Sequence, residues 1–205
     1  MTVGGTSTPT FFLPGAGGDA AFWRPMADVL GLTTPVLFSW PGLGNQTHCD
    51  GVQSIDDLVE LVETRVTGPA NVVAQSMGGL VAVHLALRKP EVIRRMVLFA
   101  TSAGVDMAQF GAADWRPDYR ETYPDAATWI EEVSVDLSDS LSGLGIPILL
   151  VWGDCDPISP VSVGKHLESM LPNANLHVVP GGDHDLGLTH ARALAPRILA
   201  HLKGD

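Results

Sequence analysis

The run Asn71-Val72-Val73-Ala74-Gln75-Ser76-Met77-Gly78-Gly79-Leu80 decides the fold of this chain. β-branched and apolar residues lead to a single serine, and an apolar, helix-like segment begins after it. We interpret the run as a strand, a one-residue turn and a helix, with Ser76 at the apex. So sharp a turn imposes unusual backbone angles on the serine, and it needs small residues two positions before and after it. Ala74 and Gly78 meet that need in an Ala-x-Ser-x-Gly pattern.

Short apolar runs alternate with helix-like segments on both sides of this stretch. The expected strands are residues 10–13, 35–40, 71–75, 96–100, 146–152 and 175–179. The expected helices are residues 22–30, 55–66, 77–88, 161–171 and 189–202. Continuously apolar strands that alternate with helices are typical of a parallel sheet covered on both faces. The pattern therefore predicts an α/β fold, a three-layer sandwich whose mostly parallel sheet has about six strands.

Residues 101–142 interrupt this alternation with aromatic residues, prolines and glycines. We expect a short lid inserted there, with one helix from residue 125 to about residue 133 and an accessible pocket beneath it. The remaining pattern is continuous, so we expect a single domain over residues 1–205 that carries this insertion.

Composition excludes several classes of function. The net charge of −11 argues against nucleic-acid and anionic-membrane partners, because phosphate groups are bound by concentrated Lys and Arg. We see no apolar run long enough to span a bilayer and no leader-like N-terminus, and we expect a cytoplasmic protein. Two cysteines, Cys49 and Cys155, make no disulfide framework, which agrees with a reducing compartment.

Four chemically suggestive stretches come directly after expected strands: residues 14–19, Ser76, residues 154–157 and residues 181–184. Ligands of parallel α/β sheets bind beyond the carboxyl ends of the strands. We therefore expect these stretches to meet at one edge of the sheet.

The residue types at that edge suit nucleophilic catalysis. A serine hydroxyl becomes a good nucleophile only when a base takes its proton, and a third group must orient that base. We predict Ser76 as nucleophile, His184 as base and Asp156 as the orienting acid. An oxyanion needs donors already aimed at it. The backbone N–H groups of Met77 and Ala16 are the candidates.

Other residues near the edge compete for these roles. Asp154 is the rival orienting acid, and His190 is the second candidate base, although we expect it in or near the last helix. Asp183 and Asp185 flank the predicted base and are expected to be turn and cap residues. Cys155 lies between two aspartates, so its thiol pKa should be raised, which is the wrong direction for a nucleophile.

Five stretches resemble, in order, the signature motifs of the α/β-hydrolase superfamily: Pro14-Gly15-Ala16-Gly17-Gly18, Pro41-Gly42-Leu43-Gly44, Ala74-Gln75-Ser76-Met77-Gly78-Gly79, Gly153-Asp154-Cys155-Asp156 and Gly181-Gly182-Asp183-His184. The resemblance runs from about residue 10 to residue 200. It implies the chain order Ser, Asp, His, and its Gly-x-x-Asp spacing favours Asp156 as the acid. Within the superfamily the chain is similar to the esterases, lactonases and C–C hydrolases, a group that includes menaquinone-pathway synthases and acyl-carrier methyl esterases.

The resemblance implies a serine hydrolase that cleaves a small, mostly apolar carboxylic ester or lactone through an acyl-enzyme. The alternatives are a C–C bond hydrolase or menaquinone-pathway-type synthase with the same triad, or a hydrolase-fold ligand-binding receptor with little turnover. Leu80 stands where menaquinone-type relatives carry a basic residue, which disfavours that assignment. Pro14 replaces a frequent histidine, and the usual N-terminal strand pair is missing.

Substrate contacts are expected from Gly15, Gln75 and Trp115, although Gln75 could instead bond the backbone. Arg116 and Arg120 in the lid are candidates to bind a carboxylate. Three other aromatic residues are candidates for the pocket wall: Trp23, Tyr119 and Trp129.

We expect no cofactor and no metal, because the His, Asp and Cys residues lack zinc-type spacing. The expected partner is a small-molecule ester or lactone, bound by a monomer or homodimer.

Overall fold

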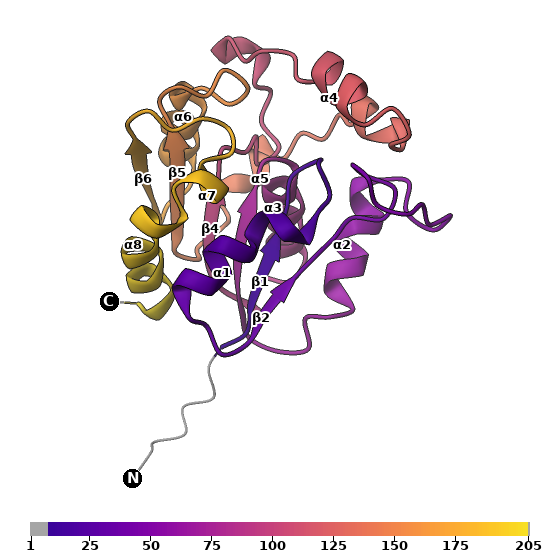
Figure 1. The fold of residues 1–205 in the computed structure, drawn as a ribbon. Helices are drawn as coiled ribbons and strands as arrows, with labels where there is room; N and C mark the ends of the chain where they lie inside the picture. The colour runs from indigo at the N-terminus through magenta and orange to yellow at the C-terminus, as the bar shows by residue number, and fades with distance from the viewer. Residues whose placement is uncertain (1–7, 205) are drawn as a thin grey trace.

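The computed structural model describes residues 8–204 of the chain (Figure 1). A six-stranded sheet lies at its centre in the order β2-β1-β3-β4-β5-β6, and neighbouring strands are parallel. The strands are β1 (Thr10–Leu13), β2 (Pro35–Leu37), β3 (Ala70–Gln75), β4 (Ile93–Phe99), β5 (Ile148–Gly153) and β6 (Ala174–Val179). The predicted α/β sheet of about six strands is confirmed.

Helices cover both faces of the sheet. The helices are α1 (Arg24–Leu30), α2 (Ile55–Glu63), α3 (Met77–Arg88), α4 (Arg116–Thr122), α5 (Ser138–Leu141), α6 (Val161–Met170), α7 (Leu186–Thr189) and α8 (Ala191–Lys203). Within residues 8–204 three 3₁₀ helices accompany them: η1 (Ala20–Trp23), η2 (Ala108–Phe110) and η3 (Thr128–Glu132). One core cluster joins the sheet to α2, α3 and α6, and a second joins it to α1, α7 and α8. The three-layer sandwich follows from these two cores.

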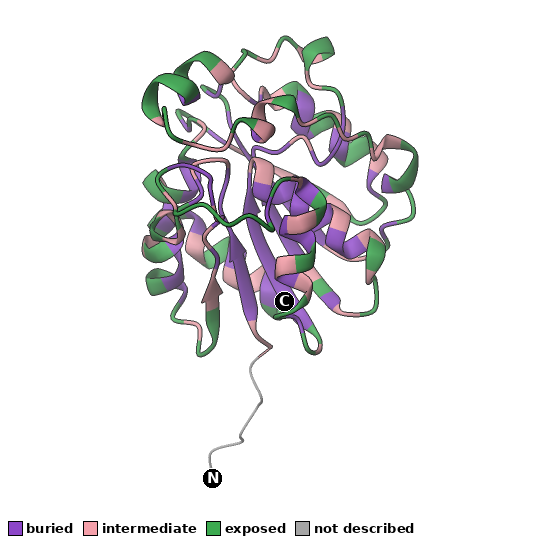
Figure 2. Ribbon diagram, turned by 90° about the vertical axis from the view of Figure 1, so that its right-hand side faces the viewer, coloured by how far each residue is buried: buried purple, intermediate pink, exposed green. Residues whose placement is uncertain are grey.

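The strands read as continuous apolar runs because both of their faces are buried. Phe11 and Leu13 belong to one core, whereas Phe12 between them belongs to the other. Val72 and Val73 divide in the same way. Successive side chains of a strand point to opposite faces of the sheet. When helices cover both faces, strand positions on either face are buried and polar residues do not alternate with the apolar ones. Figure 2 shows the central strands in the colour of buried residues.

Several expected elements end earlier or divide, and the helix expected over residues 55–66 ends at Glu63. The strand expected over residues 35–40 stops at Leu37, because the Trp40 N–H donates to the Gly18 carbonyl (2.9 Å) and the chain turns toward the loop after β1. The helix expected over residues 22–30 is η1 followed by α1, with a proline in the first turn of α1.

The segment between β4 and β5 differs most from expectation. The helix expected over residues 125–133 is wrong: the chain forms the shorter η3 there. The Ala127 N–H donates to the carbonyl of Gly42, a residue outside this segment (2.7 Å). Because Ala127 is bound in this way, the helical turn begins only at Thr128. Helix α4, which was not expected, begins with Pro117 in its first turn. We refer to residues 101–142 as the cap. Figure 1 shows α4 of the cap above the carboxyl ends of the strands.

No helix within residues 8–204 is long and apolar enough to cross a membrane.

Candidate active site

Ser76 lies at the sharp turn between β3 and α3, with φ 52° and ψ −123°. Residues other than glycine rarely adopt a positive φ, and such strain persists only where the surroundings hold it. The Ser76 N–H donates to the Phe99 carbonyl (2.9 Å), and the Thr101 hydroxyl donates to the Ser76 carbonyl (2.7 Å). The N–H group of Ser76 is therefore fixed by the last residue of β4, and its carbonyl group by Thr101, two residues further along the chain.

The glycines after Ser76 allow the helix to approach its neighbours. A Cβ on Gly78 would overlap the carbonyl oxygens of Leu13 and Pro14. A Cβ on Gly79 would overlap the side chain of Thr101. The small residues of the Ala-x-Ser-x-Gly pattern thus let α3 begin against the loop after β1.

His184 and Asp156 are joined by a hydrogen bond of 2.8 Å between Nδ1 and Oδ2. Asp156 is 5% exposed, and its second oxygen accepts the N–H groups of Ile158 (2.8 Å) and Ser159 (3.0 Å). A carboxylate only accepts, so Nδ1 carries the proton and Nε2 is the nitrogen left to act as base. His184 and Ser76 both line one cavity.

The rival acid Asp154 has a different partner. Its Oδ1 accepts the Gly181 N–H at 2.6 Å, which fixes the turn after β6. The neighbouring Cys155 thiol has a raised pKa, because it is hydrogen-bonded to the Asp154 carboxylate and lies in its field. Asp154 therefore shapes the turn that carries His184 and makes no bond to the imidazole.

The remaining candidates have local partners. Asp183 accepts the Asp185 N–H (3.1 Å) in the turn before α7. His190 lies between α7 and α8, and its Nδ1 is 2.8 Å from the Thr189 hydroxyl oxygen. These contacts agree with the predicted turn and helix-end positions.

The loop after β1, which carries the expected oxyanion donor Ala16, is held from two sides. The Trp40 indole donates to the Pro14 carbonyl (2.7 Å). The Tyr119 hydroxyl donates to the Ala16 carbonyl (2.9 Å) and accepts the Gly44 N–H (3.0 Å). Tyr119 belongs to α4, so the cap itself holds the loop.

Met77, the other expected donor, is the first residue of α3. The first N–H groups of a helix have no partner inside the helix, and the helix dipole adds positive charge there. Met77 and Ala16 line the same cavity as Ser76.

The residues expected to contact the substrate, Gly15, Gln75 and Trp115, also line this cavity. Gln75 and Trp115 make further contacts within the protein. Gln75 is 4% exposed, and its side-chain amide donates to the His184 carbonyl at 3.3 Å. Its Oε1 fills the space where Gly15 would carry a Cβ. Trp115 packs edge-on against Tyr119, with ring centres 5.3 Å apart. Gln75 thus connects the serine strand to the histidine loop.

The cavity has a volume of about 1240 Å³ and lies between the loops after β1, β3 and β6 and the cap. Its apolar wall includes Leu80, Val105, Met107, Ile130 and Val135. Two expected wall residues are absent from the described lining. Trp23 is wholly buried against Phe12 and Phe99 beneath the site, and Trp129 packs against the core.

The two arginines expected to bind a carboxylate are engaged within the cap. Arg116 forms an ion pair with Asp114 (3.0 Å), and its Nε donates to the Glu131 carbonyl (2.8 Å). Arg120 forms an ion pair with the Glu131 side chain. Both guanidinium groups therefore already have anionic partners.

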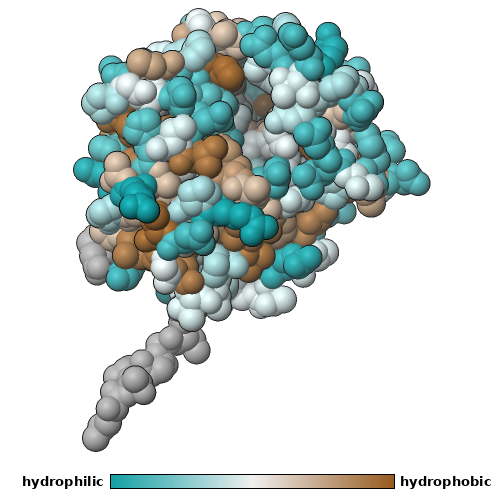
Figure 3. All heavy atoms as spheres, in the orientation of Figure 1, coloured by the Kyte–Doolittle hydropathy of each residue, from teal (hydrophilic) through white to brown (hydrophobic). Residues whose placement is uncertain are grey.

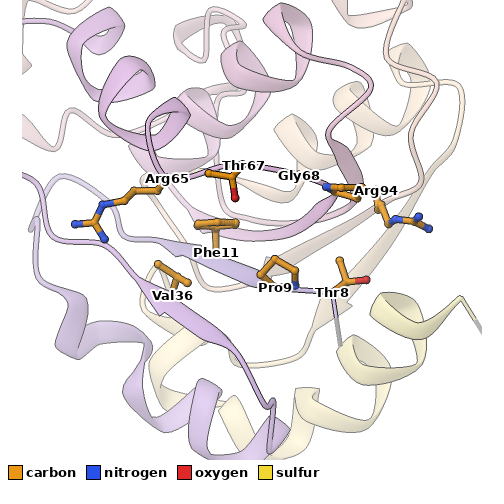
Figure 4. A pocket seen from close by; sticks show the side chains of 9 residues that line it. Thr8, Pro9, Phe11, Val36, Arg65, Thr67, Gly68 and Arg94 are labelled. Atoms are coloured by element: carbon orange, nitrogen blue, oxygen red, sulfur yellow. The ribbon is translucent and has the colours of Figure 1, made fainter. Parts of the chain in front are cut away.

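A second, smaller cavity of about 520 Å³ lies at the amino ends of the strands (Figure 4). Phe11, Pro9 and Val36 line it, and Figure 4 shows Arg65 and Arg94 at its opposite sides, directed away from each other. Its lining offers no paired nucleophile and base. Within residues 8–204 there is also no group of three His, Cys, Asp or Glu residues that could hold a metal ion.

Sequence reasoning missed the residues that hold the site together. Thr101, Trp40 and Tyr119 fix the serine and the loop after β1 from distant parts of the chain. Their partners are backbone carbonyls, which leave no pattern of residue types in the sequence.

Comparison with known proteins agrees with this architecture. Pimeloyl-[acyl-carrier protein] methyl ester esterase of Vibrio atlanticus is 22% identical, covering 97% of this chain and 95% of that one. The protein of the same name from Neisseria meningitidis serogroup C is 25% identical over 90% of each chain. A solved structure of a thermophilic esterase from Thermogutta terrifontis, with malate bound, has a TM-score of 0.77 and 21% identity, and covers 98% of this chain and 91% of that one.

At these identities the solved structure establishes likeness of fold alone. The family is established separately, because residues 11–143, more than half of the chain, match the model described as "Alpha/beta hydrolase family". The chain belongs to the alpha/beta hydrolase family.

Proposed function

We propose that this chain is a serine hydrolase that cleaves a small, mostly apolar carboxylic ester or lactone. One observation carries the proposal: a serine in a strained strand-to-helix turn shares a cavity with a histidine whose Nδ1 is bound to a buried carboxylate at 2.8 Å. The names of the curated relatives, methyl ester esterases, support ester cleavage as the reaction class. We also propose that residues 1–205 form one domain with residues 101–142 as its cap.

The first half-reaction forms an acyl-enzyme. His184 Nε2 takes the proton of the Ser76 hydroxyl while its oxygen attacks the ester carbonyl carbon. The N–H groups of Met77 and Ala16 receive the oxyanion, and each such donor is typically worth about 2.7–4 kcal/mol. The C–O bond of the ester then breaks, and His184 gives its proton to the leaving alcohol.

The second half-reaction releases the acid. His184 takes a proton from water, the resulting hydroxide attacks the acyl carbon, and the proton returns to the Ser76 oxygen as it leaves. The buried carboxylate of Asp156 stabilises the imidazolium in both halves and keeps Nε2 directed at the reacting atoms.

The cavity wall supports a mostly apolar substrate. Leu80 takes part in this wall, at the position where the resemblance places the carboxylate-binding basic residue of menaquinone-type relatives. This disfavours a menaquinone-pathway-type reaction. Hydrolysis of a C–C bond would use the same triad, and nothing in the cavity favours it.

Kinetics with p-nitrophenyl esters of increasing acyl length test the proposal. The Ser76→Ala variant, confirmed to be folded by circular dichroism, should lose on the order of 10⁴–10⁶-fold in kcat. Equal rates for wild type and variant would remove Ser76 from the nucleophile's role. Binding of esters without turnover by the wild type would favour the ligand-binding receptor instead.

A further inference from the structure

Carboxylates surround the candidate site. Eight acidic residues line the cavity: Asp19, Asp106, Asp114, Asp118, Glu131, Glu132, Asp136 and Asp185. Six of them belong to the cap, and two belong to the loops after β1 and β6. A substrate bound in the cavity is therefore surrounded by acidic groups of the cap and of these two loops.

Positive charge at the cavity is sparse and internally paired. Arg116 is the only lysine or arginine in the described lining, and it is paired with Asp114. Arg120 is outside the lining and is paired with Glu131. Among residues 8–204, ion pairs with lysine or arginine reach only these two of the eight carboxylates.

Local contacts favour the charged form of two of these carboxylates, Asp114 and Asp136. The hydrogen bond from the Arg116 side chain lowers the pKa of Asp114, and the side chain of Ser138 does the same for Asp136. Partial burial raises the pKa of Asp185, so its charged form is less favoured than those of Asp114 and Asp136. The acidic character of the entrance therefore comes mainly from the cap.

An aromatic series lies along α4 and its two flanking residues, beside the carboxylate of Asp118. Trp115, Tyr119 and Tyr123 line the cavity, with ring centres 5.3 and 5.1 Å apart along the series. The guanidinium of Arg116 already lies 5.4 Å from the centre of the Trp115 ring. Aromatic faces attract cations through their quadrupoles, and this series therefore suits an ammonium group as well as an alkyl chain.

The hydropathy of the molecular surface agrees with a polar cap. Figure 3 shows hydrophilic side chains gathered at the upper right, where Figure 1 places α4, and more hydrophobic ones in the lower half of this face. The polar surface of the cap on this face is thus exposed to solvent.

We infer that the site selects esters by charge: it prefers esters that carry an ammonium group, accepts neutral esters and rejects anionic ones. This inference rests on the proposed hydrolase function. A cleft lined by one sign of charge concentrates oppositely charged ligands and raises their association rate by about 10–10³-fold. An anionic ester meets a field of its own sign, and both nearby guanidinium groups are already paired.

The test uses three esters of one acyl group, chosen as the best acyl length in the p-nitrophenyl series. Their alcohols are choline, its neutral isostere 3,3-dimethylbutan-1-ol and the anion 2-hydroxyethanesulfonate. At 10 mM ionic strength kcat/KM should fall about tenfold at each step from cation to neutral to anion. At 0.5 M salt the three values should move toward one another, because the screening length falls to roughly 4 Å.

Variants locate the effect in the cap. The double variant Asp118→Asn, Glu132→Gln removes two unpaired carboxylates and should reduce the choline-to-neutral ratio about threefold. Glu121→Gln is the matched control, since Glu121 is exposed on α4 but is not part of the lining. That control should leave the ratio unchanged.

Binding of the same esters to folded Ser76→Ala, measured by calorimetry, separates this inference from the proposed function. An order of affinity from cation to neutral to anion, together with an inactive wild type, would overturn the hydrolase proposal and leave the charge selection standing. A choline ester that is turned over and bound no better than its neutral isostere at low salt would overturn the charge selection alone.

Discussion

The floor and the cap of the cavity are built in different ways. The floor residues Ser76, Asp156 and His184 follow strand ends, and each is fixed by bonds to backbone or to another floor residue. The cap lies over them and connects to the floor through scattered contacts, notably the Tyr119 hydroxyl and the Ala127 N–H. We therefore expect the chemistry to depend on the floor, and the choice of substrate and the position of the loop that carries Ala16 to depend on the cap.

This difference matters because the two regions can be altered separately. A change in the floor should reduce turnover of every ester in proportion. A change in the acidic lining of the cap should alter the ratio between esters. Tyr119 is the expected exception, because it belongs to the cap but its hydroxyl holds the loop after β1 through the Ala16 carbonyl.

After removal of the nucleophile itself, the largest effect is expected from the orienting acid. Asp156→Asn removes the negative charge at His184 Nδ1 and permits the wrong tautomer, so kcat should fall on the order of 10⁴-fold. Steady-state kinetics with the best p-nitrophenyl ester measure it. Asp154→Asn is the matched control two residues away, and its loss should stay within about tenfold, because Asp154 bonds only the turn. Equal losses in the two variants would contradict the assignment.

A smaller effect is expected where the floor is tightly packed. Gly78→Ala places a methyl group against the Pro14 carbonyl and pushes α3 away from the loop after β1. Displacing a donor in this way should lower kcat by about 10²-fold and reduce the free energy of unfolding by roughly 1–3 kcal/mol. Urea unfolding and kinetics check both parts. Gly145→Ala, where a Cβ meets nothing within 4 Å, should change neither.

The contact between the two regions is tested by Tyr119→Phe. The change removes the bond to the Ala16 carbonyl and leaves the Gly44 N–H without its partner. We expect kcat to fall about tenfold with KM nearly constant, since a looser donor affects the transition state more than the bound ester. Affinity for a boronic acid transition-state analogue should fall in parallel. Tyr123→Phe is the neighbouring control, and an equal rise in KM for both variants would indicate general cap damage.

The smallest effect is expected far from both regions. Burial lowers the pKa of His201, whose Nε2 lies 3.0 Å from the Met96 carbonyl. The unfolded chain, with an ordinary histidine pKa of about 6.5, then binds the proton more readily, so stability should fall as pH drops below about 6.5. His84 and His177 are shifted in the same direction by burial. Urea midpoints at pH 7.5 and 5.5 should show the decline, with a smaller difference for His201→Asn.

Catalytic parameters at pH 7.5 should be unchanged in His201→Asn. A lower kcat in this variant would mean that α8 influences the candidate site. That result would contradict the prediction that only the floor and the cap affect catalysis.

The sequence predicted the floor better than the cap for a physical reason. Helix α3 begins and ends where expected, because a strained serine precedes it and Pro90 follows it. Strands β3 to β6 are recognisable from their apolar runs, since both faces of the sheet are buried. The elements that carry the candidate site are thus encoded locally.

The cap is encoded by contacts between distant residues. Helix α4 has seven residues, too short for propensity to define it, and it is held by Tyr119 against two loops near residues 16 and 44. The choice between Asp154 and Asp156 was similarly open from residue types alone. It depends on whether a carboxylate bonds Gly181 or His184, which only the folded loops determine.

The central claim is that Ser76 is the nucleophile of the floor, and covalent labelling tests it most directly. Wild type and folded Ser76→Ala would be treated with a fluorophosphonate, followed by intact mass measurement and peptide mapping. We predict one adduct per wild-type chain, mapped to Ser76, and none on the variant. An adduct of equal yield on Ser76→Ala, or one mapped to another serine in the wild type, would contradict the account.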